Sequence, residues 1–239
     1  MTSSETATPS DSATDSMSAS PTEDGTPISS EKLQSIIADT RQGLGASVSI
    51  DATSTGYVSW EQSFVGTADV DSGMADGQVS VGAAAPRDRL IVDSTMFTRT
   101  INRWVAVDIN RQGVPEGDVL LLWSVLAGAT DARQKPGDTG STISATLPAT
   151  SLLEALGKSI KADDAGISQR LQTAAKGVNA SVVITTDADG FISMVTIATT
   201  LNVNGTPTAL SLHAMFSDYG QVLDVRKPIA SPIYTPEGQ

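Results

Sequence analysis

The side chains that most often carry catalysis are scarce in this sequence, and no catalytic signature connects them. There is one histidine, His213, and there is no cysteine. His213 lies on the polar side of the alternating stretch 210–216, which is typical of a solvated histidine in a strand. A serine hydrolase needs a base beside its nucleophile, and the sequence lacks the Gly-x-Ser-x-Gly turn that presents such a serine. We therefore expect that the protein is not an enzyme, with a carboxylate-based hydrolase as the weak alternative.

The residues that could bind a metal ion or a phosphate also lack the spacing that this chemistry requires. Residues 187–190 (Asp-Ala-Asp-Gly) lack the third carboxylate and the distant Glu of an EF-hand calcium loop, so they predict a hairpin turn. Residues 43–45 (Gly-Leu-Gly) lack the third glycine of a dinucleotide-binding loop and follow a helical pattern instead of a strand. Asp163 and Asp164 are explained as charges at a helix N-terminus. The sequence thus predicts no cofactor and no metal.

The charge balance excludes one class of partner. The 27 acidic and 15 basic residues give a net charge of −12. Lys and Arg do not gather into a stripe, so nucleic acid is not expected as a partner. The negative sign also argues against docking on anionic lipid headgroups by charge alone. The longest apolar run, residues 119–129, is too short to cross a bilayer.

Residues 1–28 predict a disordered tether. They are almost entirely Ser, Thr, Ala, Asp, Glu and Pro, and such a segment cannot bury enough apolar surface to offset the entropy of ordering it. This composition is typical of a spacer between an anchor and a domain. We hypothesise that Met1 replaces a lipid-modified cysteine and its signal sequence, which would make the protein exported and surface-tethered. Residues 29–230 then form the domain, and residues 231–239 form a C-terminal tail.

The elements that would position any site follow two periods. Residues 30–43 repeat apolar side chains at helical spacing, with Ser29 or Ser30 as the cap. From Ala46 onward apolar and polar residues alternate through many short runs separated by turns, which is typical of an antiparallel meander. Helical patterns follow in the middle of the chain, and strands return between residues 180 and 226. The order of elements predicts an α+β chain.

An excess of apolar helical surface is the most informative feature. Residues 119–126 are apolar on nearly every side, so a helix formed by them must be surrounded by other parts of the protein. Two interpretations stay open. The helix fills the concave face of the sheet and completes an ordinary core, or helix and sheet leave an apolar cavity that accepts acyl chains.

The C-terminal part of the chain carries a family resemblance. Residues 216–228, from Phe-Ser-Asp-Tyr-Gly-Gln to Arg-Lys-Pro, resemble the closing strand of the LppX/LprG-type actinobacterial (mycobacterial) lipoproteins, whose fold is similar to that of the lipoprotein carrier LolA. The helix at residues 30–43 before a meander, residues 144–149 before a helix, and the 187–190 hairpin lie in matching places. The sequence departs from the family at Val222, where proline is usual, and it has no lipobox cysteine.

The resemblance implies a LolA-like fold, a strongly curved antiparallel β half-barrel with helices packed across its concave face. It implies a non-catalytic cell-envelope lipoprotein that binds and carries acylated lipid or glycolipid in an apolar cavity between sheet and helices. It further implies anchorage on the outer face of the cell membrane, with a membrane transporter as an optional partner. The alternative is a surface interaction or signalling module of the same fold with a filled core. The side chains that we expect to face the cavity are Trp60, Phe64, Leu122, Trp123, Leu126, Ile197, Leu201, Leu212 and Phe216.

Overall fold

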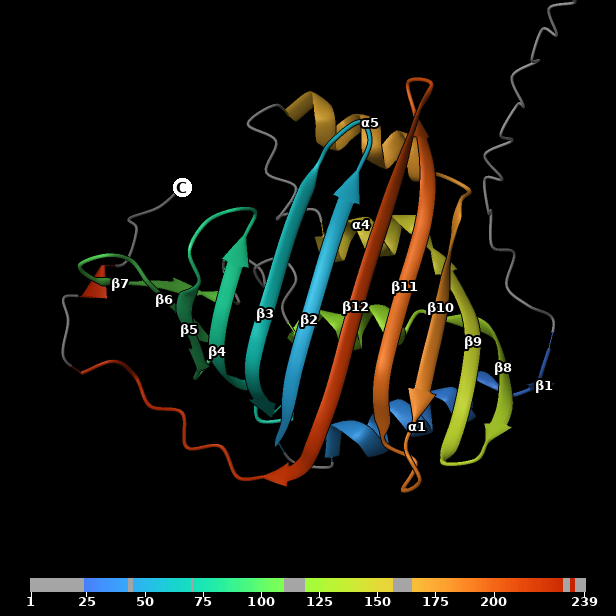
Figure 1. Cartoon of the computed structure of the whole chain (residues 1–239), viewed down its shortest axis with the longest axis horizontal. Coiled ribbons are helices and arrows are strands. Elements are labelled where there is room, and N and C mark those ends of the chain that lie inside the picture. The colour runs from blue at the N-terminus through green and yellow to red at the C-terminus, as the bar shows by residue number, and fades with distance from the viewer. Residues whose placement is uncertain are drawn as a thin grey trace, which may run out of the picture.

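One curved sheet with helices on a single face forms the part of the chain that the structure describes. The computed structural model describes residues 24–42, 45–69, 71–109, 119–156, 165–229 and 233–234. Figure 1 shows the central strands in front and the helices behind them. The helices are α1 (Ser30–Gln42), α3 (Val119–Leu126), α4 (Ala149–Leu156) and α5 (Ala165–Ala175).

The sheet is built from two meanders. Its strands are β1 (Thr26–Pro27), β2 (Gly45–Thr55), β3 (Trp60–Asp69), β4 (Met74–Val81), β5 (Arg87–Val92), β6 (Thr95–Arg99), β7 (Trp104–Asp108), β8 (Thr130–Gly137), β9 (Gly140–Pro148), β10 (Asn179–Thr186), β11 (Ile192–Val203), β12 (Thr206–Gln221) and β13 (Ile233–Tyr234). The 13 strands lie in the order β1-β8-β9-β10-β11-β12-β2-β3-β4-β5-β6-β7-β13. The meander β2 to β7 meets the meander β8 to β12 where β12 pairs with β2. Within the described ranges every pair is antiparallel except β7 with β13, which is parallel over two residues.

The sheet is strongly curved and open. In Figure 1, β6 and β7 run across the direction of β2, β3 and β12, so this end of the sheet bends away from the central strands. The strand order ends at β1 on one side and at β13 on the other, and no pairing between described strands closes it into a barrel. The predicted fold class, an α+β half-barrel with helices across one face, is confirmed.

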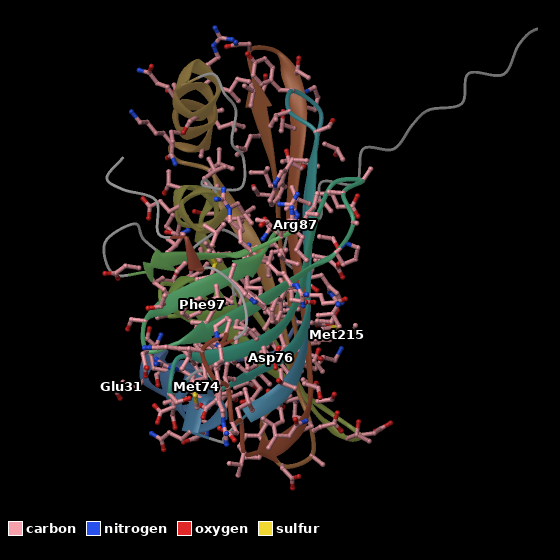
Figure 2. All side chains as sticks on the ribbon, turned by 90° about the vertical axis from the view of Figure 1, so that its left-hand side faces the viewer. Glu31, Met74, Asp76, Arg87, Phe97 and Met215 are labelled. Carbon is pink, nitrogen blue, oxygen red and sulfur yellow. The ribbon has the colours of Figure 1, made fainter. Side chains whose placement is uncertain are left out.

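Alternation along the strands decides which side chains face the helices. On β2 and β3, the cross-strand neighbours Ile50 and Phe64 are buried, whereas the next pair, Asp51 and Ser63, lies on the opposite face. Figure 2 shows Met215 of β12 on the side of the sheet that points away from the helices. The two-residue period therefore sets one apolar and one largely polar face, as the sequence predicts.

The opening helix also forms as its sequence predicts. Ser29 caps α1, because its Oγ accepts a hydrogen bond from the Lys32 backbone N–H at 3.2 Å. Leu33, Ile36 and Ile37 are buried at helical spacing and hold α1 against the sheet.

A small second core lies on the outer face of the bent end of the sheet. Phe97 and Trp104, from β6 and β7, are buried there with Val92 and Ala106. Val225 from the segment after β12 packs against this cluster. Lys227, two residues further on, forms a 3.1 Å ion pair with Asp93. We call residues 222–229 the C-terminal strap, because they fasten the end of the chain to the outer face of β5 to β7.

The structure differs from the expected elements at three places. Residues 221–226 were expected as a strand, but β12 continues unbroken to Gln221 and the following residues form the strap. Strand β8 was not expected, because residues 130–137 are polar and do not alternate. β1 and β13 lie in the ranges assigned to the tether and to the tail, and each adds two residues to one edge of the sheet. Asp163, Asp164 and the 43–44 glycine-leucine pair lie outside the described residues.

Candidate functional site

The concave face of the sheet and the inner sides of the helices form one continuous apolar interior. All nine side chains expected at a cavity belong to this interior, eight as buried members of the main hydrophobic cluster and Trp60 as a half-buried side chain packed against it. The buried eight are Phe64, Leu122, Trp123, Leu126, Ile197, Leu201, Leu212 and Phe216. The strand residues among them lie on the side of the sheet that faces the helices.

Strand register and helix position bring these residues together from distant parts of the chain. Ile197 and Leu212 are cross-strand neighbours on β11 and β12, and Leu212 in turn faces Ala52 of β2. Helix α3 places Trp123 over β12, with its ring centroid 5.3 Å from that of Phe216. Apolar side chains separated by up to about two thirds of the chain thus share one water-excluded space.

Four buried side-chain donor atoms of the described residues lack a matching acceptor; one is Nε of Arg89, a residue with another interaction, and three belong to neutral side chains on the helix-facing side. The indole Nε1 atoms of Trp60 and Trp123 and the Thr98 hydroxyl are buried, and no described residue accepts a hydrogen bond from them. Trp60 and Thr98 lie on the helix side of β3 and β6, in parity with buried Phe64 and Met96, and Trp123 is on α3. A donor that is buried away from water and has no acceptor lowers the stability of the fold by about 1–3 kcal/mol. Each of these donors is therefore a place where a bound molecule could supply an acceptor.

His213 lies outside this interior. It is half-buried on the other parity of β12, where its Nδ1 is 3.1 Å from Thr196 Oγ1. Asp51 is its cross-strand neighbour on β2. The buried polar side chains of the described ranges are Thr40, Ser54, Gln62, Thr186 and Thr208, which are uncharged.

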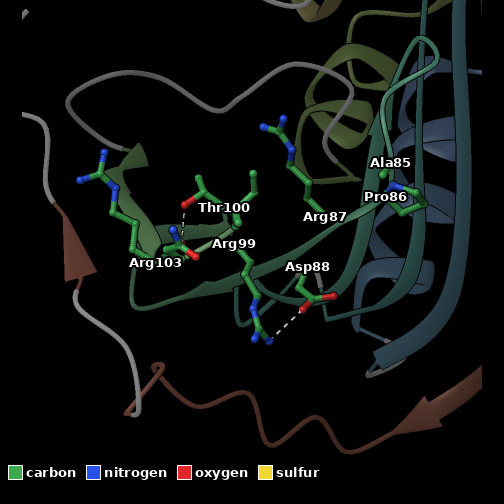
Figure 3. A pocket seen from close by; sticks show the side chains of 9 residues that line it. Ala85, Pro86, Arg87, Asp88, Arg99, Thr100 and Arg103 are labelled. Atoms are coloured by element: carbon green, nitrogen blue, oxygen red, sulfur yellow. Dashed lines mark hydrogen bonds and ion pairs between the residues drawn. The ribbon is translucent and has the colours of Figure 1, made fainter.

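A separate pocket of about 820 Å³ opens at the bent end of the sheet. Its walls come from the connection into β5 and from the turn between β6 and β7. The lining residues are Ala85, Pro86, Arg87, Asp88, Arg99, Thr100, Ile101, Asn102 and Arg103. We call it the arginine pocket (Figure 3).

Sequence reasoning missed the arginine pocket. Its three arginines are spread over 17 residues that also include Arg89, and they are separated by neutral and acidic residues, so no basic run marks them in the sequence. Pairing of β5 with β6 brings them to one end of the sheet, where Arg89 of β5 faces Thr98 of β6. The signal that could have found them is the strand parity of residues 87–103 combined with the hairpin between these strands.

Neither a metal site nor a membrane-spanning helix appears in the ranges that the structure describes. No three His, Asp or Glu side chains gather there in a way that could hold a metal ion. No helix within those ranges is both long enough and apolar enough to cross a bilayer.

No family model matches the chain, and no curated protein does. The chain is similar to the solved structure of LprF from Mycobacterium bovis, with 14% identity and a TM-score of 0.46 over 85% of this chain and 99% of that one. It is similar to the lipoprotein LppX from Mycobacterium tuberculosis, with 14% identity and a TM-score of 0.48 over 83% of this chain and 100% of that one. A LolA superfamily protein from Nitrosomonas europaea matches with 6% identity and a TM-score of 0.28, over 78% and 94% of the two chains.

The solved structures thus include LppX, which the sequence resemblance names, and a LolA superfamily protein. At these identities and TM-scores, the similarity carries no ligand and no activity over to this chain.

Proposed function

We propose that the protein is a non-catalytic lipid-binding protein that holds acyl chains between the concave face of its sheet and the helices across it. The observation that carries the proposal is the apolar interior with three buried donors, Trp60 Nε1, Trp123 Nε1 and Thr98 Oγ1, that lack a described acceptor. An acylated lipid has both features that such an interior needs. Its chains contact apolar side chains, and its ester or amide carbonyl oxygens accept hydrogen bonds.

The affinity of such a site comes mainly from the chains. Each CH₂ group that leaves water contributes about 0.8 kcal/mol, so two long chains bind firmly with few polar contacts. The buried Trp and Thr donors then determine how deeply the carbonyl groups of the lipid enter the interior. Selection among lipids would follow chain volume more than headgroup chemistry.

The proposal extends to the kind of cargo and to the place of action. The sequence resemblance implies an acylated lipid or glycolipid that is carried across the cell envelope by a protein anchored to the outer face of the membrane.

One observation favours the alternative function. The eight buried side chains of the expected site pack in a single cluster, which is also what a filled core looks like. A surface interaction module with this core would bind no lipid and would use its outer face.

Tryptophan quenching by brominated lipids separates the two functions. The chain has three tryptophans. Trp60 and Trp123 belong to the interior, whereas Trp104 belongs to the second core on the outer face, so Trp104 is an internal control. We would compare a Trp104→Phe variant with a Trp60→Phe/Trp123→Phe variant. Each would be titrated with phosphatidylcholine brominated in its acyl chains, below the critical micelle concentration.

Quenching in Trp104→Phe and none in the double variant is the expected result, because bromine quenches only at close range. Equal tryptophan emission with and without lipid in both variants would contradict the lipid-binding function and favour the interaction module. Quenching of Trp104 alone would place the lipid on the outer face and contradict the proposal as well.

A further inference from the structure

The arginine pocket carries a positive local charge on a chain that is strongly negative overall. Three arginines and one aspartate line it, against a net charge of −12 for the chain. Asp88 is occupied by Arg99 at 3.5 Å, and Arg99 also lies over the Trp104 ring, with Cζ 5.9 Å from its centroid. The local charge of the pocket is therefore opposite in sign to the net charge of the protein. An anion is attracted to this end of the molecule and repelled elsewhere.

Arg87 and Arg103 line the pocket from β5 and from the turn before β7. Figure 3 shows their side chains extending to one side of the strands, while Arg99 extends to the other side towards Asp88. The exposed side chain of Arg87 makes neither a hydrogen bond nor an ion pair with the residues that the structure describes. A guanidinium group offers paired N–H donors that match the oxygens of a phosphate.

An exposed apolar side chain stands at the rim of the same pocket. Ile101 is 97% exposed at the turn between β6 and β7, although isoleucine is among the residues most often buried. Thr100 Oγ1 donates to the Arg103 carbonyl oxygen at 2.8 Å and, with the Thr100 N–H bond to the same oxygen, closes this turn and keeps Ile101 at its tip. An apolar side chain next to arginines suits the boundary between headgroups and acyl chains of a bilayer.

We propose that the arginine pocket and Ile101 dock the protein on a membrane surface that contains anionic phospholipid. A lipid phosphate enters the pocket against Arg87 and Arg103, and Ile101 inserts into the acyl boundary beside it. Charge complementarity and the exposed apolar tip point to the same occupant, since a free phosphate would use the arginines but leave Ile101 in water. Docking would turn this end of the sheet towards the bilayer. The rest of the protein, which carries the net negative charge, would face away from the membrane.

This docking does not depend on a lipid in the interior. The pocket residues lie outside the main hydrophobic cluster and could bind a membrane even if the core were filled. Loss of docking and loss of lipid uptake are therefore separate outcomes, and they can be measured on the same variants.

Vesicle co-sedimentation tests the proposal. The full chain would be mixed with vesicles of phosphatidylcholine alone or with 30 mol% phosphatidylglycerol, roughly the range in which anionic surface potential acts. The test variants are Arg87→Gln/Arg103→Gln and Ile101→Ser. The matched control is Lys32→Gln/Arg41→Gln on α1, which removes the same charge from a surface away from the pocket. Circular dichroism and uptake of a fluorescent acyl lipid would be recorded for every variant.

We expect binding to the anionic vesicles only, weakened by salt. The arginine double variant should bind about 30-fold more weakly, since each arginine near an anionic surface contributes about 1 kcal/mol. Ile101→Ser should bind about fivefold more weakly at unchanged fold, because part of its side chain leaves the acyl boundary. The control should bind as the wild type does, and acyl-lipid uptake should persist in all three.

Several results would overturn the docking proposal. They are no binding of the wild type to anionic vesicles, equal weakening in the α1 control, or full binding by the arginine double variant. Competition by inorganic phosphate at millimolar concentration together with an unaffected Ile101→Ser variant would make the pocket a free-anion site and would equally end the membrane assignment.

Discussion

At the scale of single residues, Tyr219 links the end of β12 to the start of β11. Its hydroxyl donates to the Ile192 carbonyl oxygen, and its ring packs on Phe191 with centroids 5.1 Å apart. Burial raises the pKa of the Tyr219 phenol above its ordinary value of 10.0, and the charge of Asp187 raises it further. The phenol is therefore held neutral where it is needed as a donor.

The raised pKa predicts a loss of stability in alkali. Because the unfolded chain ionises this tyrosine near its ordinary pKa of 10.0 and the folded chain does not, the stabilisation is complete below that pH. It is lost as the pH rises from there towards the folded pKa. The Tyr219→Phe variant should be less stable at neutral pH by about 1 kcal/mol, from the lost hydrogen bond. It should also decline less steeply between about pH 9.5 and 11.5. Urea unfolding of both proteins across this range checks the prediction, and parallel pH profiles would refute it.

Leu201 tests whether the interior has room for a lipid. The side chain is 0% exposed on β11 and lies in the main cluster. In Leu201→Trp the indole would occupy space that an acyl chain needs, so we expect reduced uptake of a fluorescent acyl lipid. We expect the overpacking to cost about 1–3 kcal/mol of stability. Val65→Trp, on the outer face where Val65 is 58% exposed, is the matched control. Unchanged uptake by a folded Leu201→Trp protein would show that Leu201 does not face the ligand.

At the scale of elements, a buried hydroxyl adds a hydrogen bond to the apolar packing of helix α1 against the sheet. Thr40 Oγ1 donates to the Ile36 carbonyl oxygen at 2.9 Å and accepts from the Ile192 N–H at 3.1 Å. Ile192 begins β11 beside the register shift between β10 and β11, and its N–H is bonded to the Thr40 hydroxyl. A helix side chain thus completes the hydrogen bonding of a strand.

Replacement of this threonine by an isostere measures the bond. Thr40→Val keeps the volume but leaves the buried Ile192 N–H unsatisfied, and we expect a loss of about 1–3 kcal/mol in the free energy of unfolding. Hydrogen exchange at Ile192 should become faster in the same variant. Ser35→Ala, on the exposed side of α1 where Ser35 contacts Asp39, is the control and should change stability by less than about 0.5 kcal/mol. Equal effects of the two substitutions would argue against this role of Thr40.

Elements with a clear period or a specific turn could be predicted from the sequence. The Asn204-Gly205 turn is one example, since both residues have positive φ, 52° and 84°, as a type I′ hairpin requires. Strand β8 could not be predicted, because its polar sequence does not alternate. It forms a strand through its pairing with β9 at the side of the sheet. Which strand residues face the apolar interior follows from strand parity, whereas the arginine pocket depends on which strands pair.

At the scale of the whole molecule, the open sheet must protect two edges. An exposed edge strand offers unpaired N–H and C=O groups to other chains. β1 pairs with β8 at one end, and β13 pairs with β7 at the other, so each edge is covered by two residues of a terminal segment. The C-terminal strap adds apolar cover over Phe97 and Trp104 on the way to β13.

Truncation after Gln221 should therefore convert this end of the sheet into a self-association surface. The shortened chain loses the strap and β13, which uncovers the β7 edge and the ring of Trp104, 9% exposed in the full chain. We expect a red shift of the Trp104 emission in a Trp60→Phe/Trp123→Phe background. We also expect concentration-dependent dimers or larger species in analytical ultracentrifugation. Removal of residues 1–23, which precede the described fold, is the control and should leave both readouts unchanged. A monomeric truncated chain with unshifted emission would mean that strap and β13 are dispensable, and that β7 resists pairing through its own sequence.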